Sequence, residues 1–149
     1  RGDDAEALAA AGVEVTAFDV SQSAIAWAQK RFPDSAVNYV VIELFQLPEN
    51  WLGSFDLVFD FRTIQALPID VRQQVIEDIA SLVKPGGMAL VMTYIRLDNQ
   101  SCDVPPWPLS PTELSHFETV GLQVEHRETF RNKDSRFPSR IQVQYRAPV

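Results

Sequence analysis

The stretch that decides the fold is Val13-Glu14-Val15-Thr16-Ala17-Phe18-Asp19, a largely apolar run that ends in an acidic residue. Its β-branched and aromatic residues predict a strand over 13–19, in a sheet that is covered on both faces. Gly2 and a short helical pattern up to Gly12 precede this strand, and Ser21 follows it at the start of a second helix. A strand that ends in an acid, one strand–helix unit after a glycine-rich turn, is how doubly wound folds hold an adenine nucleotide or nucleoside.

The rest of the sequence predicts further alternation of helices and strands, and then a different ending. The order up to Tyr94 indicates a parallel sheet with right-handed crossovers. A long loop from about Ile95 to Leu109 follows, and then a helix and two strands whose apolar residues alternate, joined by a connection of roughly 8–10 residues. We therefore predict an α/β fold, with a Rossmann-like doubly wound sheet in three layers, mostly parallel with a C-terminal antiparallel hairpin, in a single domain over residues 1–149.

The element boundaries follow from the apolar periods and from Ser, Pro and Gly at the segment ends. Strands are expected over 13–19, 37–43, 55–60, 88–94, 122–130 and 141–145. Helices are expected from Asp3 with Glu6 completing a capping box, from Ser21, over 69–83, and from Ser110 with Pro111 and Glu113, the last one burying Leu114, Phe117 and Val120.

The composition argues against several classes of function. A formal net charge of −7 argues against nucleic-acid binding, and the one basic cluster is interpreted as a solvated loop and strand edge. The single cysteine, Cys102, excludes an internal disulfide, and no spacing of His, Cys or carboxylate residues suggests a metal site. No apolar run approaches the length of about 20 residues that crosses a bilayer, so we expect a cytoplasmic protein without membrane contact. The basic cluster comprises Arg127, Arg131, Lys133, Arg136 and Arg140.

Five short motifs, in order along the chain, resemble those of class I S-adenosylmethionine (SAM)-dependent methyltransferases. The terminal hairpin also separates that family from dinucleotide dehydrogenases, which usually end in another parallel strand. Residues 59–68 and 105–114 further resemble the thiopurine S-methyltransferase-like branch, although many bacterial small-molecule methyltransferases share these stretches. The five motifs are Gly2-Asp-Asp-Ala-Glu-Ala-Leu-Ala9 (glycine motif), Asp19-Val20-Ser21 (ribose), Glu43-Leu-Phe-Gln-Leu-Pro48 (adenine), Phe55-Asp-Leu-Val-Phe-Asp60 (fourth strand) and Leu82-Val-Lys-Pro-Gly-Gly87 (turn before the fifth strand).

The resemblance implies a site for SAM and for its product S-adenosylhomocysteine (SAH). Asp19 is expected to accept hydrogen bonds from both ribose hydroxyls, and Val20 to pack on the adenine with help from Ile25. Glu43 is expected to accept from the adenine amine while the Leu44 N–H meets a ring nitrogen. The alternatives are that Asp19 only caps the following helix, that Val20 and Ile25 are core residues, and that Glu43 is simply an acid at a strand end.

The resemblance also implies residues for the methionine end and the methyl group of SAM. Gly2 is expected to let the backbone approach the methionine end, and Asp3 and Asp4 to face its ammonium group, with helix capping as the alternative role for Asp3. The backbone of Asp60 and Phe61 is expected to line the transferring methyl.

The methyl acceptor is expected to be a small molecule, such as a thiol or another chalcogen nucleophile. Candidates for contact with it are Arg62 and Gln65, which follow the fourth-strand motif, and Trp107 from the long loop. Trp107 among three prolines is interpreted either as a rigid lid or as a hydrophobic plug under the loop. Methyl transfer requires no metal, and the resemblance implies none.

Two other functions remain open from the residues alone. One is a non-catalytic binding domain that has kept the fold, and the other is an NAD(P)-dependent oxidoreductase, which the terminal hairpin and the lack of a Tyr/Lys pair disfavour. The family's first strand and the first glycines of its cofactor loop have no counterpart in these residues. We therefore expect the natural protein to continue upstream, with an apolar strand that ends in a Gly-x-Gly-type turn. The sequence gives no sign of the oligomeric state.

Overall fold

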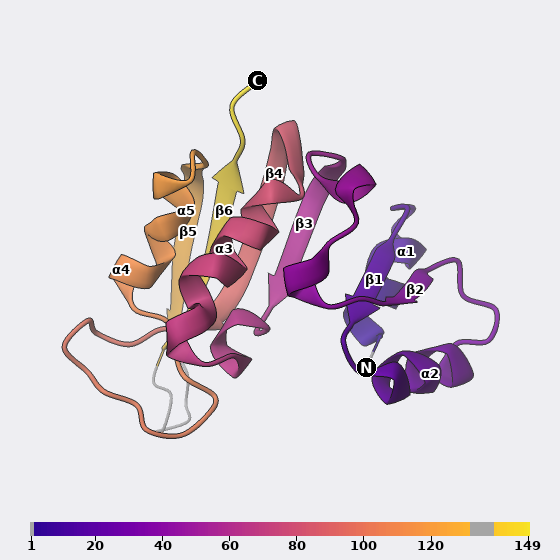
Figure 1. The fold of residues 1–149 in the computed structure, drawn as a ribbon, viewed down its shortest axis with the longest axis horizontal. Coiled ribbons are helices and arrows are strands. Elements are labelled where there is room, and N and C mark those ends of the chain that lie inside the picture. The colour runs from indigo at the N-terminus through magenta and orange to yellow at the C-terminus, as the bar shows by residue number, and fades with distance from the viewer. Residues whose placement is uncertain (1, 132–138) are drawn as a thin grey trace. The chain divides into compact units, whose positions relative to one another are not determined.

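The computed structural model describes residues 2–131 and 139–149. Two compact units, Arg1–Leu47 and Pro48–Val149, each contain a sheet of their own (Figure 1). The assignment of residues 1–149 to one domain stays a prediction.

The first unit is a small parallel sheet with two helices. Strands β1 and β2 pair in parallel with Asp19 opposite Val41, so both carboxyl ends lie at the same edge of the sheet. Both strands are shorter than predicted, because the chain is extended and paired only over these residues. Ser21 caps α2 as predicted, since its hydroxyl accepts a 3.2 Å hydrogen bond from Ala24 N–H. The elements are α1 (Asp3–Ala10), β1 (Thr16–Asp19), α2 (Gln22–Arg31), β2 (Asn38–Val41) and a 3-10 turn over Leu44–Gln46.

The predicted capping box of Asp3 and Glu6 is wrong. Gly2 is the N-cap of α1 and makes no side-chain cap, so Asp3 is already the first helical residue. The Asp3 carboxylate instead forms an ion pair of 2.8 Å with Arg31 at the end of α2. Glu6 accepts hydrogen bonds of 2.6 Å from the hydroxyls of Ser35 and Tyr39. Both acids therefore hold α1 to the segment around α2 and β2.

The second unit contains a four-stranded sheet in the order β3-β4-β6-β5. Strands β3 and β4 are parallel, whereas β6 runs antiparallel to both β4 and β5. The predicted mixed α/β Rossmann-like fold with its terminal antiparallel hairpin is confirmed. The helices α3, α4 and α5 lie over one face of this sheet (Figure 1). The elements are β3 (Phe55–Phe61), α3 (Arg72–Ser81), β4 (Val83–Tyr94), α4 (Pro111–Leu114), α5 (His116–Thr119), β5 (Gln123–Arg131) and β6 (Ser139–Arg146).

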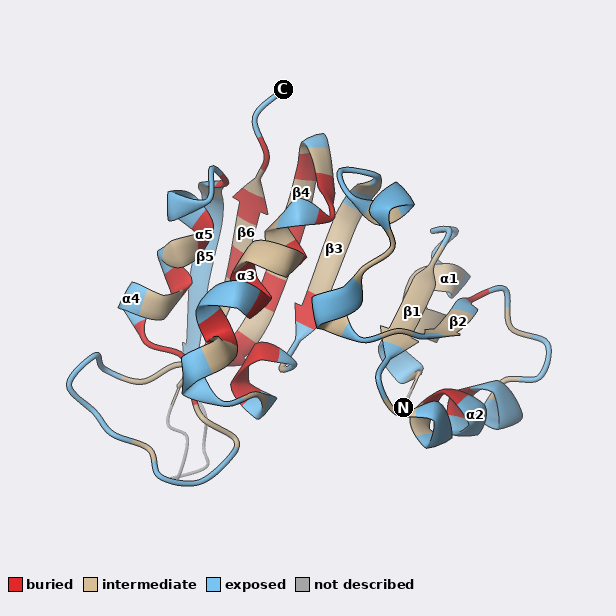
Figure 2. Cartoon of the chain, viewed as in Figure 1, coloured by how far each residue is buried: buried red, intermediate tan, exposed pale blue. Residues whose placement is uncertain are grey.

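The core of the second unit lies between that sheet face and the three helices. Buried residues alternate along β4 and β6, as the two-residue period of a strand requires (Figure 2). The Phe117 and Tyr145 rings stack with centroids 4.6 Å apart, and the Tyr145 hydroxyl donates to the Leu114 carbonyl at 3.0 Å. Helix α3 contributes its predicted apolar face, with Val75, Ile76 and Ile79 buried.

Several predicted boundaries in this unit differ from the structure. Helix α3 ends at Ser81, and β4 already begins at Val83, because the ladder pairs Phe55 with Val83 and Leu57 with Met88, so that residues 84–87 bulge out. The bulge requires glycine at position 87, where a Cβ would lie 2.9 Å from two backbone oxygens. The helix predicted from Ser110 breaks into α4 and α5, and Val120 is 37% exposed instead of buried. The hairpin connection lies outside the described residues.

Candidate functional site

The carboxyl edge of the first unit carries two carboxylates beside exposed apolar side chains. Asp19 Oδ1 accepts a 2.8 Å hydrogen bond from Ser21 N–H, while Oδ2 has no hydrogen bond among the described residues. Val20, next along the chain, is 68% exposed. Glu43 is exposed where β2 leads into the 3-10 turn, and the Leu44 N–H is the first of that turn, so no earlier carbonyl of the turn accepts from it.

This edge fits the chemistry of a nucleoside. Ribose hydroxyls and an adenine amine are donors, and exposed carboxylates such as Asp19 and Glu43 are the acceptors that suit them. The flat faces of a base suit the exposed apolar surface of Val20, Val41 and Phe45. Ile25, by contrast, is 7% exposed and belongs to the core of the unit.

Gly2 and Asp4 lie at the start of α1. Gly2 has a φ of 91°, and a Cβ on it would lie 2.7 Å from the Tyr39 hydroxyl oxygen, so the fold of this unit itself requires glycine here. Asp4 is exposed in the first helical turn, where the backbone N–H groups have no partners within the helix. The start of α1 therefore offers backbone donors next to an exposed acid.

Asp60 lies near the carboxyl end of β3 in the second unit and is only 4% exposed. Its Oδ1 accepts a 3.2 Å hydrogen bond from Thr63 N–H, and its Oδ2 has no partner among the described residues. Burial raises the pKa of the Asp60 carboxyl to about 6, against the opposing effect of the hydrogen bonds from Thr63. The neighbouring Phe61 is 39% exposed.

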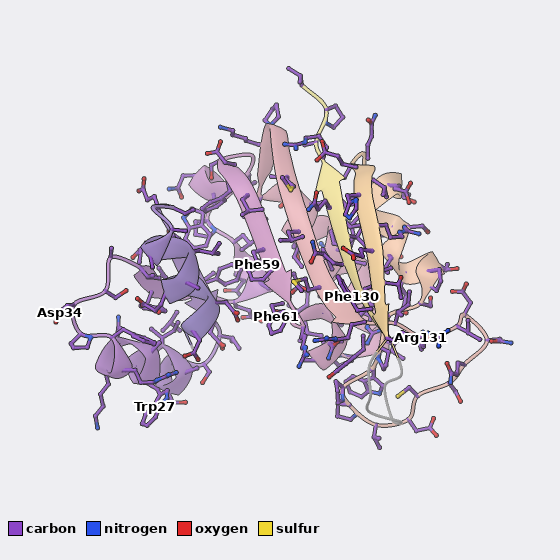
Figure 3. The ribbon with its side chains drawn as sticks, turned by 180° about the vertical axis from the view of Figure 1, so that it is seen from behind. Trp27, Asp34, Phe59, Phe61, Phe130 and Arg131 are labelled. Atoms are coloured by element: carbon purple, nitrogen blue, oxygen red, sulfur yellow. The ribbon has the colours of Figure 1, made fainter. Side chains whose placement is uncertain are left out.

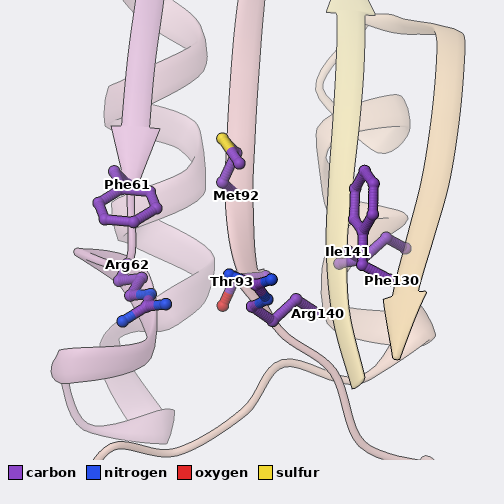
Figure 4. A pocket seen from close by; sticks show the side chains of 7 residues that line it. All are labelled: Phe61, Arg62, Met92, Thr93, Phe130, Arg140 and Ile141. Carbon is purple, nitrogen blue, oxygen red and sulfur yellow. The ribbon is translucent and has the colours of Figure 1, made fainter. Parts of the chain in front are cut away.

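A pocket of about 180 Å³ lies at the carboxyl ends of β3 and β4, on the sheet face turned away from the helices (Figures 3 and 4). In open α/β sheets, ligands bind outside the carboxyl ends of the strands. Because β6 is antiparallel to β4, the start of β6 and the end of β5 meet this same edge. The lining residues are Phe61, Arg62, Met92, Thr93, Phe130, Arg140 and Ile141.

Arg62, Gln65 and Trp107 were expected to contact the methyl acceptor, and of these three Arg62 is in the lining of this pocket. Its φ of 68° is in the left-handed region that non-glycine residues rarely adopt, and its N–H donates to the Met92 carbonyl at 3.0 Å. The guanidinium lies 4.8 Å from the ring centroids of both Phe61 and Tyr94. The cation therefore lies over two aromatic rings, whose faces attract positive charge.

Gln65 is buried and ties three segments together. Its side-chain oxygen accepts 2.8 Å hydrogen bonds from the Thr93 hydroxyl and from Tyr94 N–H, and its backbone carbonyl accepts from Trp107 N–H at 2.8 Å. These contacts position Trp107 and the end of β4. The contacts of Gln65 and Trp107 with an acceptor stay predictions.

An ion-pair network that the sequence analysis did not predict holds the long loop. Arg72 on α3 is 2% exposed, pairs with Glu113 at 2.6 Å and donates to the Trp107 carbonyl. Arg96 pairs with the other Glu113 oxygen at 2.9 Å, and Glu113 also closes the predicted capping box with Ser110. The capping box was visible in the sequence, but its two distant arginine partners left no local signal.

The part of the chain that the structure describes has neither a metal-binding cluster nor a membrane-spanning helix. Among the described residues, no group of three or more His, Cys, Asp or Glu side chains is arranged to hold a metal ion. No helix in the described part of the chain is long and apolar enough to cross a membrane.

Residues 1–87 match the family model described as a methyltransferase domain. The chain belongs to this family. The predicted membership of a methyltransferase family is thereby confirmed, and the fold is the class I fold of SAM-dependent methyltransferases. The thiopurine S-methyltransferase-like branch stays a prediction. No match was found among curated proteins.

Solved structures share the fold at low sequence identity. A SAM-dependent methyltransferase from Methanosarcina mazei has a TM-score of 0.83 at 13% identity, with 99% of this chain and 88% of that chain covered. The Burkholderia thailandensis 1,6-didemethyltoxoflavin-N1-methyltransferase, solved with 1,6-didemethyltoxoflavin and SAH, has a TM-score of 0.78 at 15% identity over 99% and 67%. The [4+2]-cyclase SpnF also matches, with a TM-score of 0.83 at 15% identity over 99% and 71%.

Proposed function

We propose that this methyltransferase domain transfers the methyl group of SAM to a small-molecule acceptor. The observation that carries the proposal is the Asp19 carboxylate, exposed at the end of β1 with one oxygen available, beside the exposed Val20 and within the stretch that matches the family. Such an acid is suited to the two adjacent hydroxyls of a ribose.

The remaining cofactor contacts in the proposal come from residues of the same sequence motifs. Glu43 accepts from the adenine amine and the Leu44 N–H donates to a ring nitrogen. Gly2 and Asp4 serve the methionine end, and the Asp60 and Phe61 backbone lines the methyl group. The exposure of Glu43 and Asp4, and the partnerless first-turn amides of α1, support these roles.

Methyl transfer requires mainly that the protein align the acceptor atom, the methyl carbon and the sulfur. SAM, when bound, would supply a methyl carbon on a positively charged sulfur, so that an acceptor lone pair could bond to that carbon in line as the carbon–sulfur bond breaks and SAH leaves. The residues of this chain orient the acceptor and keep water away, and proximity alone can be worth roughly 7–11 kcal/mol. No acid or base from the protein is required when the acceptor is already a good nucleophile. A thiol acceptor would lose its proton to solvent or to a nearby group.

The direct test is acceptor-dependent turnover. The protein is incubated with SAM and a panel of small thiols, phenols and amines, and SAH and the methylated product are quantified by mass spectrometry. We expect SAH to form in proportion to the methylated product for at least one acceptor. Thiols are the first class to test. A protein that binds SAH but methylates nothing in the panel would favour the non-catalytic alternative.

A further inference from the structure

Among the described residues, the lining of the pocket at the carboxyl ends of β3 and β4 includes two arginines and no acidic residue. The chain as a whole carries 20 acidic and 13 basic residues, so a locally cationic pocket runs against the overall composition. Among the described residues, neither Arg62 nor Arg140 forms a salt bridge, whereas Arg31, Arg72, Arg96 and Arg146 each pair with a carboxylate. Two like charges in one pocket repel each other unless an anion lies between them.

Two aromatic rings contact the Arg62 guanidinium. Its guanidinium lies 4.8 Å from the centroids of Phe61 and Tyr94, and its backbone φ of 68° carries strain of the kind found at functional sites. The planar guanidinium suits a carboxylate or phosphate, which can accept two parallel hydrogen bonds from it. Arg62 is therefore oriented before any ligand arrives.

Arg140 reaches the same pocket from the opposite side. It lies on β6 between its cross-strand partners Tyr94 on β4 and Phe130 on β5. Figure 4 shows its side chain extending from β6 across β4, into the space that Arg62 enters from the end of β3. An anion in this space would meet cations from two strands.

The other residues of the lining are mostly apolar, and the whole pocket is about large enough for a single ring. Among the described lining residues, Phe61, Met92, Phe130 and Ile141 supply apolar and aromatic surface, and Thr93 is the one that is polar and uncharged. The volume of about 180 Å³ is close to the 150 Å³ of an engineered protein cavity that binds benzene. One six-membered ring therefore fits.

We propose that this pocket binds the methyl acceptor, and that the acceptor is a one-ring, apolar molecule carrying an anionic group that Arg62 and Arg140 contact. This inference rests on the proposed methyl transfer for the identity of the ligand as an acceptor. The anionic group is a carboxylate or a phosphate ester, and two probes distinguish these sources.

The test is a ligand-observed NMR titration of the full chain with benzoate, phenyl phosphate and the uncharged benzamide. We expect benzoate or phenyl phosphate to bind with saturation and benzamide to bind roughly tenfold more weakly, as expected for the loss of charge-assisted hydrogen bonds. The tighter of the two anions identifies the anionic group. Equal binding of benzamide and both anions, or no saturable binding of any probe, would overturn the proposal.

Variants locate the binding. Arg62→Gln and Arg140→Gln should each weaken anion binding by roughly tenfold. Arg127→Gln removes the same charge from β5 at an exposed position outside the pocket lining, and should leave binding unchanged. If Arg62→Gln lowers the melting temperature, its weaker binding could come from partial unfolding, and Arg140→Gln then tests the anion contact on its own. Equal losses in all three variants would show a nonspecific charge effect and would overturn the proposal.

A parallel SAH titration separates this inference from the proposed function. If SAH binds and the anions are not preferred, the acceptor class is wrong and methyl transfer stands. If the anions bind through Arg62 and Arg140 and the protein does not bind SAH, the pocket is an anion site and the proposed methyl transfer is wrong.

Discussion

The backbone N–H of Trp107 donates a 2.8 Å hydrogen bond to the backbone carbonyl of Gln65. This bond joins the proline-rich loop to the segment that follows β3, whose end lines the pocket. The Gln65 side chain extends the junction to β4 through Thr93 and Tyr94. Gln65, which the sequence predicted to contact the methyl acceptor, thus also positions Trp107 and the end of β4.

Gln65→Ala should destabilise the protein. The substitution leaves the Tyr94 N–H and the Thr93 hydroxyl without their acceptor in a buried place, which costs about 2–3 kcal/mol. The exposed glutamine Gln73 on α3 is the matched control, and Gln73→Ala should change the free energy of unfolding by less than about 0.5 kcal/mol. Urea denaturation measures both. Equal effects of the two substitutions would show that the junction contributes nothing.

Glu113→Ala should be more costly still. It removes the partner of Arg72, a guanidinium that is 2% exposed, and breaking one half of a buried pair typically costs about 3–5 kcal/mol. The substitution also removes the capping box at Ser110. Glu118→Ala, at an exposed position on α5, serves as the control and should be nearly neutral. A loss below about 1 kcal/mol in Glu113→Ala, measured by denaturation, would contradict this account of how the loop is held.

Asp60 should make stability depend on pH. Its folded-state pKa of about 6 lies above its usual value of 3.8, so the folded state holds this proton more tightly than the unfolded state. The contribution is therefore fully present below about pH 4 and is lost as the pH rises through 6. A shift of this size corresponds to about 3 kcal/mol.

Asp60→Asn isolates that contribution. The asparagine oxygen can still accept from Thr63 N–H, but the residue carries no charge to bury. The free energy of unfolding of the variant minus that of the parent should rise between pH 4 and pH 7 by up to about 3 kcal/mol. Denaturation curves at four pH values give this difference. A difference that stays constant with pH would show that Asp60 keeps an ordinary pKa.

The order of strands and the antiparallel ending could be predicted because they depend on local apolar periods. The alternation of Ile141, Val143 and Tyr145 predicted a strand with one buried face, and all three residues are buried. The predicted cap at Ser21 and the capping box at Ser110 were also found, since a capping motif is complete within four residues.

The parts that failed depend on partners far away in the sequence. Asp3 looked like a capping residue, but Arg31 and the left-handed backbone of Gly2 give it another role. Arg140 is exposed, in keeping with its interpretation as solvated, but its place beside Arg62 follows from the antiparallel pairing of β6 with β4 and was not predicted. No local pattern could have predicted either pairing.

The proposed function depends first on the contact between Asp19 and the ribose of SAM, and calorimetric titration with SAM and SAH measures that contact. NADH is the negative ligand. Asp19→Asn keeps an oxygen for Ser21 N–H and removes only the charge, while Asp34→Asn removes a charge from an exposed loop of the same unit. We expect micromolar binding of SAH by the parent and by Asp34→Asn, a loss of roughly tenfold or more in Asp19→Asn, and no binding of NADH. Undiminished SAH binding by Asp19→Asn, or NADH binding that depends on Asp19, would contradict the account.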